Sequence, residues 1–130
     1  MLRVLVTGSR DLTRQEDRAL VFQALTDCAI SCRWDMLVIH GACPTGADQW
    51  ADEFVDEWNE HGVRKKIFPA QWRIYGKKAG PLRNQEMVEF GADLCLAFPL
   101  GISVGTRGCM EMAQKANIPV YEFYPRKWGS

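Results

Sequence analysis

The sequence lacks long hydrophobic runs, and it has no excess of charge of either sign. No apolar stretch approaches the roughly 20 residues that a membrane-spanning helix requires. The N-terminal "MLRVLVTGSRD" holds a short apolar segment that Arg3 interrupts, which is not typical of a signal peptide. The 16 basic and 16 acidic side chains cancel, which argues against a protein that coats nucleic acid through a general basic surface. We therefore expect a cytoplasmic protein with no membrane or nucleic-acid partner, and a local anion site remains possible.

The sequence also lacks a CxxC pair and a histidine at ligand spacing to Cys28 and Cys32. The odd number of cysteines and the lack of a CxxC pair are typical of reduced thiols in the cytosol, and the five stand at positions 28, 32, 43, 95 and 109. Cys28 and Cys32 are one helical turn apart, a spacing that could suggest a metal. Neither His40 nor His61 has ligand spacing to that pair, so we interpret both cysteines as small core residues. We expect no metal site, and the sequence indicates no cofactor.

What the sequence does have is a regular alternation of strand-like and helix-like segments. Apolar runs that end in glycine, proline or an aromatic residue predict five strands, at 2–8, 35–41, 63–69, 93–99 and 118–124. Periodic apolar stripes and glycine stops predict helices between them, near 18–32, 47–62, 83–91 and 105–117. Thr13 and Glu16 have the spacing of a capping box for the first helix. Residues 70–82, with mixed polarity, two glycines and a proline, are expected to form a loop.

This alternation predicts an α/β fold, a Rossmann-like three-layer sandwich. We expect a single-domain protein with a mostly parallel five-stranded sheet in the order 3-2-1-4-5 and helices on both faces. The third strand is more polar and is placed near an edge. Because 130 residues suffice for one domain and are too few for two, residues 1–130 are expected to form one ligand-binding domain, with a frayed tail at 125–130.

The glycine-rich loops of this chain are expected to meet at one crevice. In an open parallel sheet a ligand lies at the carboxyl ends of the strands, where the strand order reverses, here between strands 1 and 4. Strand 1 delivers "TGSRD" to that point, strand 2 delivers "HGACPTGAD" and strand 4 delivers "PLGISVGTRG". The candidate ligand-binding residues are Gly8, Ser9, Arg10, Gly41, Gly46, Asp48, Arg83, Asn84, Gly105 and Thr106.

The chemistry of these residues favours a phosphate. Gly105 and Thr106 open a helix, whose first backbone N–H groups lack internal partners and whose dipole attracts an anion. The guanidinium of Arg83 can grip a phosphate bidentately, and Arg10 is a second cation at the same edge. Under the competing interpretation the glycines make tight turns, Thr106 is an N-cap and the arginines are surface charges.

Two carboxylates and two aromatic residues remain open to either interpretation. Asp48 can accept a hydrogen bond from a ribose hydroxyl or cap its helix. Glu86 can face the site or form a surface ion pair with Arg83. Trp72 and Tyr75 can stack on a base or close a lid, or they can cover the sheet edge as ordinary packing.

Four separated motifs carry a resemblance to a known family. The segments "VTGSRDLT", "HGACPTGADQWADEF", "KKAGPLRNQEM" and "GADLCLAFP…GT" follow one another over roughly residues 3 to 122. Together they resemble the YspA-related branch of the SLOG superfamily. The resemblance implies a Rossmann-like fold that binds nucleotides or nucleotide-derived ligands. The superfamily also includes LOG-type phosphoribohydrolases, which cleave the N-glycosidic bond of nucleoside monophosphates, and DNA-processing proteins of the DprA type.

The first half of the LOG-type pattern is similar to R-K-x-E-M. Arg83, Glu86 and Met87 match it, and Asn84 replaces the lysine. The resemblance therefore implies that the arginine of this motif is kept.

The second half of the pattern is similar to P-G-G-x-G-T-x-x-E. Pro99, Gly105 and Thr106 match it, although "LGISV" makes the intervening loop longer. Cys109 stands at the position of the catalytic glutamate, and Glu111 lies about 200° further round an ideal helix. A thiol neither stabilises an oxocarbenium ion nor activates water well, so the usual hydrolytic group is expected to be lost. The phosphate-binding residues of the pattern are expected to be kept.

These observations lead to three hypotheses of unequal weight. The first is a module that senses or sequesters a nucleotide or nucleotide-derived ligand. The second is a phosphoribohydrolase or related hydrolase with Arg83, Glu86 and Asp48 as candidate catalytic residues. The third, a DNA-processing protein, is weaker because the chain is neutral. A homo-oligomer is also expected, since related proteins commonly pair and the chain has five tryptophans.

Overall fold

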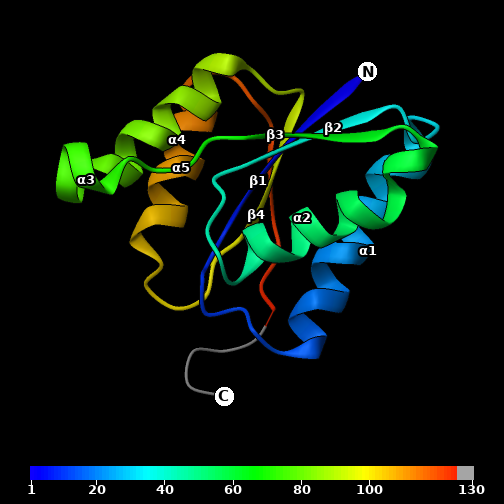
Figure 1. Cartoon of the computed structure of the whole chain (residues 1–130), viewed down its shortest axis with the longest axis horizontal. Helices are drawn as coiled ribbons and strands as arrows, with labels where there is room; N and C mark the ends of the chain where they lie inside the picture. The colour runs from blue at the N-terminus through cyan, green and yellow to red at the C-terminus, as the bar shows by residue number, and fades with distance from the viewer. Residues whose placement is uncertain (126–130) are drawn as a thin grey trace.

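The computed structural model of the protein describes residues 1–125, and its centre is one sheet of five parallel strands in the order β3-β2-β1-β4-β5 (Figure 1). The strands are β1 (Leu2–Gly8), β2 (Met36–His40), β3 (Val63–Ile67), β4 (Leu94–Phe98) and β5 (Val120–Glu122). Each pair of neighbours is parallel. The predicted fold class and strand order are confirmed, and the polar strand β3 lies at an edge as expected.

The helices cover both faces of this sheet and complete a three-layer sandwich (Figure 1). They are α1 (Gln15–Ser31), α2 (Ala47–Trp58), α3 (Trp72–Tyr75), α4 (Ala79–Phe90) and α5 (Val104–Lys115), with short 3₁₀ turns at Asn59–His61 and Gly76–Lys78. Helices α1 and α2 pack together on one face, and α4 and α5 pack together on the other.

The central strand β1 shows why its sequence is apolar at consecutive positions. Val4 and Val6 are fully buried in the cluster under α1 and α2, whereas Leu5, between them, is fully buried in the cluster under α4 and α5. A strand covered on both faces needs apolar side chains on both, because successive side chains point to opposite sides.

The segment 70–82 differs from the expected loop. It contains α3 and a 3₁₀ turn, and α4 begins at Ala79, four residues before the predicted start at Arg83. Pro81 is tolerated because it lies in the first helical turn, where its missing N–H has no intrahelical partner to lose. Gly80 leaves room for the indole of Trp72, which would lie 3.3 Å from a Cβ at that position.

The start of α1 also differs from the prediction. The helix begins at Gln15, and the N–H of Arg14 donates to the carboxylate of Asp17 at 3.0 Å. The predicted capping box of Thr13 and Glu16 is therefore wrong by one residue. The capping box is formed by Arg14 and Asp17, which have the same spacing, because the helix begins one position later than predicted.

Two further sequence expectations concern the ends of the chain and the membrane. Within residues 1–125 no helix is both long enough and apolar enough to cross a membrane. The predicted fraying concerns residues 125–130, of which 126–130 lie outside the described part of the chain.

Phe54 offers a direct test of the core under α1 and α2. It is fully buried and meets the ring of Phe22 edge-to-face at 5.4 Å between centroids. We expect Phe54→Ala to lower the free energy of unfolding by about 3–5 kcal/mol, because it removes a large buried side chain and leaves a cavity. Urea unfolding followed by circular dichroism measures this change. The exposed Tyr124 is the control, and Tyr124→Ala is expected to stay within about 0.5 kcal/mol of the unmodified protein.

Candidate functional site

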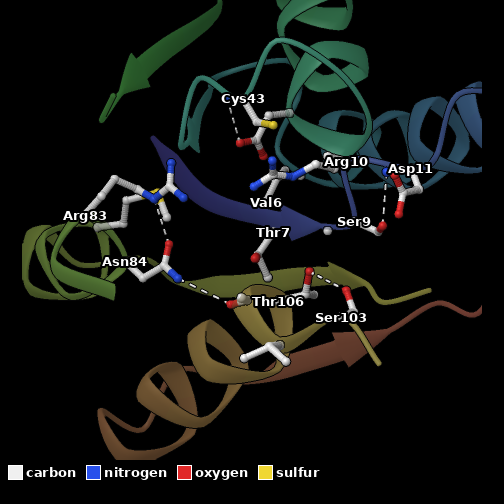
Figure 2. Close-up of a pocket in the computed structure, with 15 residues that line it drawn as sticks. Val6, Thr7, Ser9, Arg10, Asp11, Cys43, Arg83, Asn84, Ser103 and Thr106 are labelled. Carbon is white, nitrogen blue, oxygen red and sulfur yellow. Dashed lines mark hydrogen bonds between the residues drawn. The ribbon is translucent and has the colours of Figure 1, made fainter. Parts of the chain in front are cut away.

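A cavity of about 290 Å³ opens at the carboxyl ends of β1 and β4, where the strand order reverses (Figure 2). Its walls come from segments far apart in the sequence: the end of β1, the loop before α2, helix α4 and the start of α5. The lining residues are Val6, Thr7, Gly8, Ser9, Arg10, Asp11, Cys43, Asp48, Arg83, Asn84, Met87, Ser103, Val104, Gly105 and Thr106.

All of the predicted ligand-binding residues except Gly41 and Gly46 line this cavity. Those two glycines lie behind it, against arginines that do line it. The structure does not bring every other candidate to the cavity. Glu86 is exposed on α4, Trp72 and Tyr75 are exposed on α3, and none of the three is among the lining residues.

The loop between β4 and α5 presents the start of a helix to the cavity. Ser103, the N-cap of α5, has a left-handed backbone with φ 45°, and its hydroxyl donates to Thr106 Oγ1 at 2.9 Å. The first N–H groups of α5 lack partners within the helix and carry its positive dipole end. A Cβ on Gly105 would meet no atom within 4 Å, so the absence of a side chain there leaves the backbone open to approach.

Arg83 is held by a short chain of hydrogen bonds that crosses the cavity wall. Its Nη1 donates to the carbonyl oxygen of Gly41 at 2.6 Å, and its Nε donates to Asn84 Oδ1 at 2.8 Å. The amide nitrogen of Asn84 donates in turn to the carbonyl oxygen of Gly105 at 3.3 Å. The loop after β2, helix α4 and the first turn of α5 are thereby joined around one guanidinium (Figure 2).

Arg10 approaches the same cavity from the other side. It follows β1 directly and is exposed, and Figure 2 shows its side chain directed toward the space that Arg83 also faces. Its carbonyl oxygen accepts a hydrogen bond from Thr45 Oγ1 at 2.9 Å. The arrangement places two cationic side chains and one helix N-terminus around a single hollow.

Asp48 is the buried carboxylate of the cavity. It is 8% exposed, and its Oδ2 accepts a hydrogen bond from the N–H of Cys43 at 3.1 Å. Burial raises the pKa of Asp48 above its ordinary value, although the nearby His40, the Cys43 N–H and Arg83 partly oppose this. Asp48 also borders a second cavity of about 380 Å³, which shares Cys43 with the first.

A buried polar network at the end of β2 was not predicted from the sequence. His40 Nε2 lies 2.9 Å from Asp52 Oδ1, and the N–H of Ala42 donates to His40 Nδ1 at 3.0 Å. Because Nδ1 accepts, the proton of the neutral ring is on Nε2 and is donated to Asp52. The available signal was the one-turn spacing of Asp48 and Asp52 on α2, which places both carboxylates on the side that faces β2.

Lys65, on the edge strand β3, balances the negative charge of Asp52 in this network. Lys65 Nζ on β3 lies 3.0 Å from Asp52 Oδ1. Burial raises the pKa of Asp52, but hydrogen bonds from Lys65 and His40 outweigh it, so the pKa is lowered overall. Asp52 is therefore ionised at neutral pH and ties β2, β3 and α2 together beside the second cavity.

Cys109 lies behind the cavity wall and does not line it. The thiol is fully buried in the core under α4 and α5, and burial raises its pKa to about 11, although a hydrogen bond with Thr7 opposes the shift. Glu111 is exposed further along α5 and is absent from the lining. The position expected for a hydrolytic glutamate therefore holds a neutral, inaccessible thiol.

The described residues 1–125 contain no group of three or more His, Cys, Asp or Glu side chains that could hold a metal ion. The cavity offers cations and amides, and its one deeply buried carboxylate is Asp48. This set of groups suits an anionic ligand with hydroxyl groups better than it suits a cation.

The fold and the cavity define a Rossmann-like α/β domain with a crevice, lined by two arginines and a helix start, at its topological switch point. Residues 2–75 match the model of a family described as "YspA, cpYpsA-related SLOG family", and the chain belongs to this family. The match ends before α4 and α5, so it includes Arg10 and Asp48 but not Arg83 or Thr106.

Individual proteins extend the comparison over most of the chain. The chain is 50% identical over 125 residues to the "Gene 61 protein" of Mycobacterium phage D29, covering 95% of this chain and 97% of that protein. A crystal structure of the C-terminal domain of a hydrogenase from Pyrococcus furiosus is similar, with a TM-score of 0.50, 14% identity, and coverage of 93% of this chain and 89% of that one. At this identity the structural likeness shows a shared fold and nothing about activity.

The burial of the thiols predicts which cysteines react in the folded protein. Cys95 and Cys109 are fully buried and their pKa values are raised by burial, whereas Cys43 is partly exposed at the cavity. Because the thiolate is the reactive form, a brief treatment with a maleimide at pH 7 should label Cys43 and leave Cys95 and Cys109 unmodified. Peptide mass mapping measures the labelling at each site. Labelling of Cys109 at the rate of Cys43 would contradict the placement of Cys109 behind the wall.

The raised pKa of Asp48 predicts a pH-dependent stability difference. A carboxyl whose folded pKa is raised above its unfolded value stabilises the fold only while protonated, so this contribution is lost as pH rises from about 4 through the folded pKa. Asp48→Asn keeps an oxygen acceptor for the Cys43 N–H without the charge. The stability of Asp48→Asn relative to the unmodified protein should therefore increase between about pH 4 and pH 7. Urea unfolding in phosphate-free buffer measures it, and a difference that does not vary with pH would contradict the prediction.

Proposed function

We propose that the protein binds a nucleotide or nucleotide-derived compound in the cavity at the carboxyl ends of β1 and β4, as a sensor or sequestering module. The observation that carries the proposal is the convergence of Arg10, Arg83 and the open start of α5 on one hollow. Membership of a SLOG family supports a nucleotide-related role.

The electrostatics of the cavity support a phosphate as the anchoring group. A phosphate accepts strong charge-assisted hydrogen bonds from guanidinium groups and from the backbone N–H groups of a helix start. The Arg83 guanidinium is already oriented by Gly41 and Asn84, so little of its conformational freedom is left to lose on binding. Gly105 leaves the α5 backbone open to the same group.

The two cavities that meet at Asp48 have room for a sugar and a base as the remainder of the ligand. Asp48 is the shared wall between the first cavity and the second, and its carboxyl can accept a hydrogen bond from a ribose hydroxyl. The second cavity has apolar surface from Pro44 and Ile67 and a side-chain amide from Gln49, a mixture that suits a planar polar ring.

Binding without hydrolysis is favoured because the carboxylates expected from the LOG-type pattern are not at the cavity. Cys109 is buried behind it, and Glu86 and Glu111 are exposed outside it. Cleavage of an N-glycosidic bond needs a group that stabilises positive charge on the ribose and activates water.

A second candidate function rests on Asp48 alone. It is a buried carboxyl that lines the cavity, and its raised pKa is the property of a general acid working near neutral pH. In that function the protein is a nucleotide N-glycosidase in which Arg83 and α5 hold the phosphate and Asp48 protonates the leaving base.

Three further features of the protein belong to the proposal. The chain acts as one domain over residues 1–130, it works in the cytoplasm, and it forms a homo-oligomer. Exposed apolar side chains such as Ile74 on α3 and Ile102 near the cavity are available for contact with a second copy.

A nucleotide panel tests the proposed function. A ligand present at about 100 times its Kd stabilises the folded state by about 2.7 kcal/mol, which raises the melting temperature by several degrees. We expect at least one nucleoside phosphate to produce such a shift, and Arg83→Ala to weaken that binding about 10- to 100-fold through the loss of charge-assisted hydrogen bonds. Differential scanning fluorimetry and isothermal titration calorimetry measure the two effects.

The control for this experiment is Arg73→Ala, which removes an exposed arginine on α3 outside the cavity. Binding that is equally reduced in Arg73→Ala would point to nonspecific charge. Chromatography for free base in the same samples separates the two functions: base released by the unmodified protein and not by Asp48→Asn selects the hydrolase. If no nucleotide in the panel shifts the melting temperature, the proposed function is wrong.

A further inference from the structure

Arg10 and Arg83 reach the cavity from opposite walls, and Arg83 interacts with the Asp48 carboxyl there over a longer distance than an ion pair. Within residues 1–125, neither guanidinium lies within 4.0 Å of a carboxylate. Figure 2 shows both side chains directed into the same hollow, above the end of β1. Two like charges that converge on one cavity repel each other, so the arrangement is favourable when an anion lies between them.

Gly41 sets the position of Arg83. The carbonyl oxygen of Gly41 accepts the 2.6 Å hydrogen bond from Arg83 Nη1. A Cβ on Gly41 would overlap the guanidinium itself. A residue with a side chain at position 41 would push the guanidinium away from the loop. Glycine at 41 is therefore explained by the placement of Arg83.

Gly46 sets the position of Arg10 in a similar way. Its φ of 81° is a left-handed conformation, and a Cβ there would overlap the backbone of Ser9 and Arg10. Thr45 Oγ1 donates to the carbonyl oxygen of Arg10, and the N–H of Ala47 donates to that of Ser9 at 3.3 Å. The loop before α2 thus fixes the backbone from which the Arg10 side chain enters the cavity.

One loop therefore positions two cations, through Gly41 at its beginning and Gly46 at its end. We propose that Arg10 and Arg83 form a clamp for two adjacent phosphates, so that the ligand is a diphosphate-bearing compound and not a monophosphate. This inference rests on the proposed function and specifies the ligand class of the same cavity.

The number of donors supports two phosphates. Arg83 spends two of its N–H groups on Gly41 and Asn84, and its remaining groups face the cavity. The side chain of Arg10 makes no hydrogen bond within residues 1–125, and the first turn of α5 adds backbone N–H groups. A diphosphate spreads its terminal oxygens over two phosphorus atoms and carries more negative charge than a monophosphate, so one phosphate can lie at each guanidinium.

Inorganic pyrophosphate and orthophosphate are the probes that isolate this clamp from the recognition of a base. Isothermal titration calorimetry in magnesium-free buffer should show pyrophosphate binding at least about 10-fold more tightly than orthophosphate. Arg10→Ala should bring the two affinities to within about 3-fold of each other, because it leaves one guanidinium and the start of α5 for a single phosphate. Gly41→Ala, which touches no ligand, should reduce pyrophosphate binding by displacing Arg83.

Two controls accompany these variants. Arg73→Ala should leave the ratio of the two affinities unchanged, since this arginine lies outside the cavity. Arg10→Lys keeps the charge without the bidentate fork, and it should retain an intermediate preference for pyrophosphate. Circular dichroism of each variant establishes that it is folded, and the exposed position of Arg10 makes its substitution compatible with the fold.

Equal affinity for the two probes, or binding of neither, overturns the clamp. A preference for pyrophosphate that survives in Arg10→Ala also overturns it, because the second cation is then not responsible. The proposed function fails in a different way. If a nucleoside monophosphate stabilises the protein as much as its diphosphate, the clamp is wrong and nucleotide binding stands; if no nucleotide stabilises it, nucleotide binding itself is wrong.

Discussion

The parallel pairing of β1 with β4 is the constraint on which the rest of the molecule depends. The chain returns past β1 to add β4 on the side away from β2, with Gly8 in register with Phe98 and the N–H of Ser9 donating to the Phe98 carbonyl at 3.1 Å. The loops that leave β1 and β4 must then diverge to opposite faces of the sheet, because the helices that follow them lie on opposite faces. That divergence opens the cavity.

Backbone atoms of the loop before α2 position the two arginines that line the cavity. Arg83 is fixed by the Gly41 carbonyl, and the backbone of Arg10 is fixed by Thr45 and the close approach of Gly46. These contacts fix the guanidinium of Arg83 and the backbone of Arg10, and they leave both guanidinium groups facing the cavity. In the proposed function, glycine positions in the sequence thus contribute to anion binding through the arginines that they position.

Membership of the SLOG family suggests a nucleotide-related role, and the side chains near the cavity bear on whether the proposed ligand is bound or hydrolysed. The substitution at position 109 places a thiol in the hydrophobic layer under α5, where burial keeps it neutral. Asp48 is the buried carboxyl that lines the cavity together with Arg10 and Arg83. Its burial favours the protonated form, which can donate a proton but is a poor nucleophile. The proposed binding of a ligand needs none of this chemistry.

The sequence by itself determined the sheet, its strand order and most of the residues around the cavity. Apolar runs such as Val4–Val6 are long enough to require cover on both faces, and the alternation of strands and helices leaves few topologies. Loops that end parallel strands must meet at one edge, so Arg10, Asp48 and Thr106 could be placed together without coordinates.

Only the tertiary structure decided the roles of particular side chains. Gly41 and Gly46 support the two arginines from behind, because the space that a Cβ would fill is occupied by atoms distant in sequence. Glu86, which matches the LOG-type pattern, is exposed because the face of α4 that packs against the protein carries Asn84 and Met87. The His40–Asp52–Lys65 network joins β2, α2 and β3. Such contacts depend on distances between elements to within about 1 Å, and periodicity along a chain does not specify these.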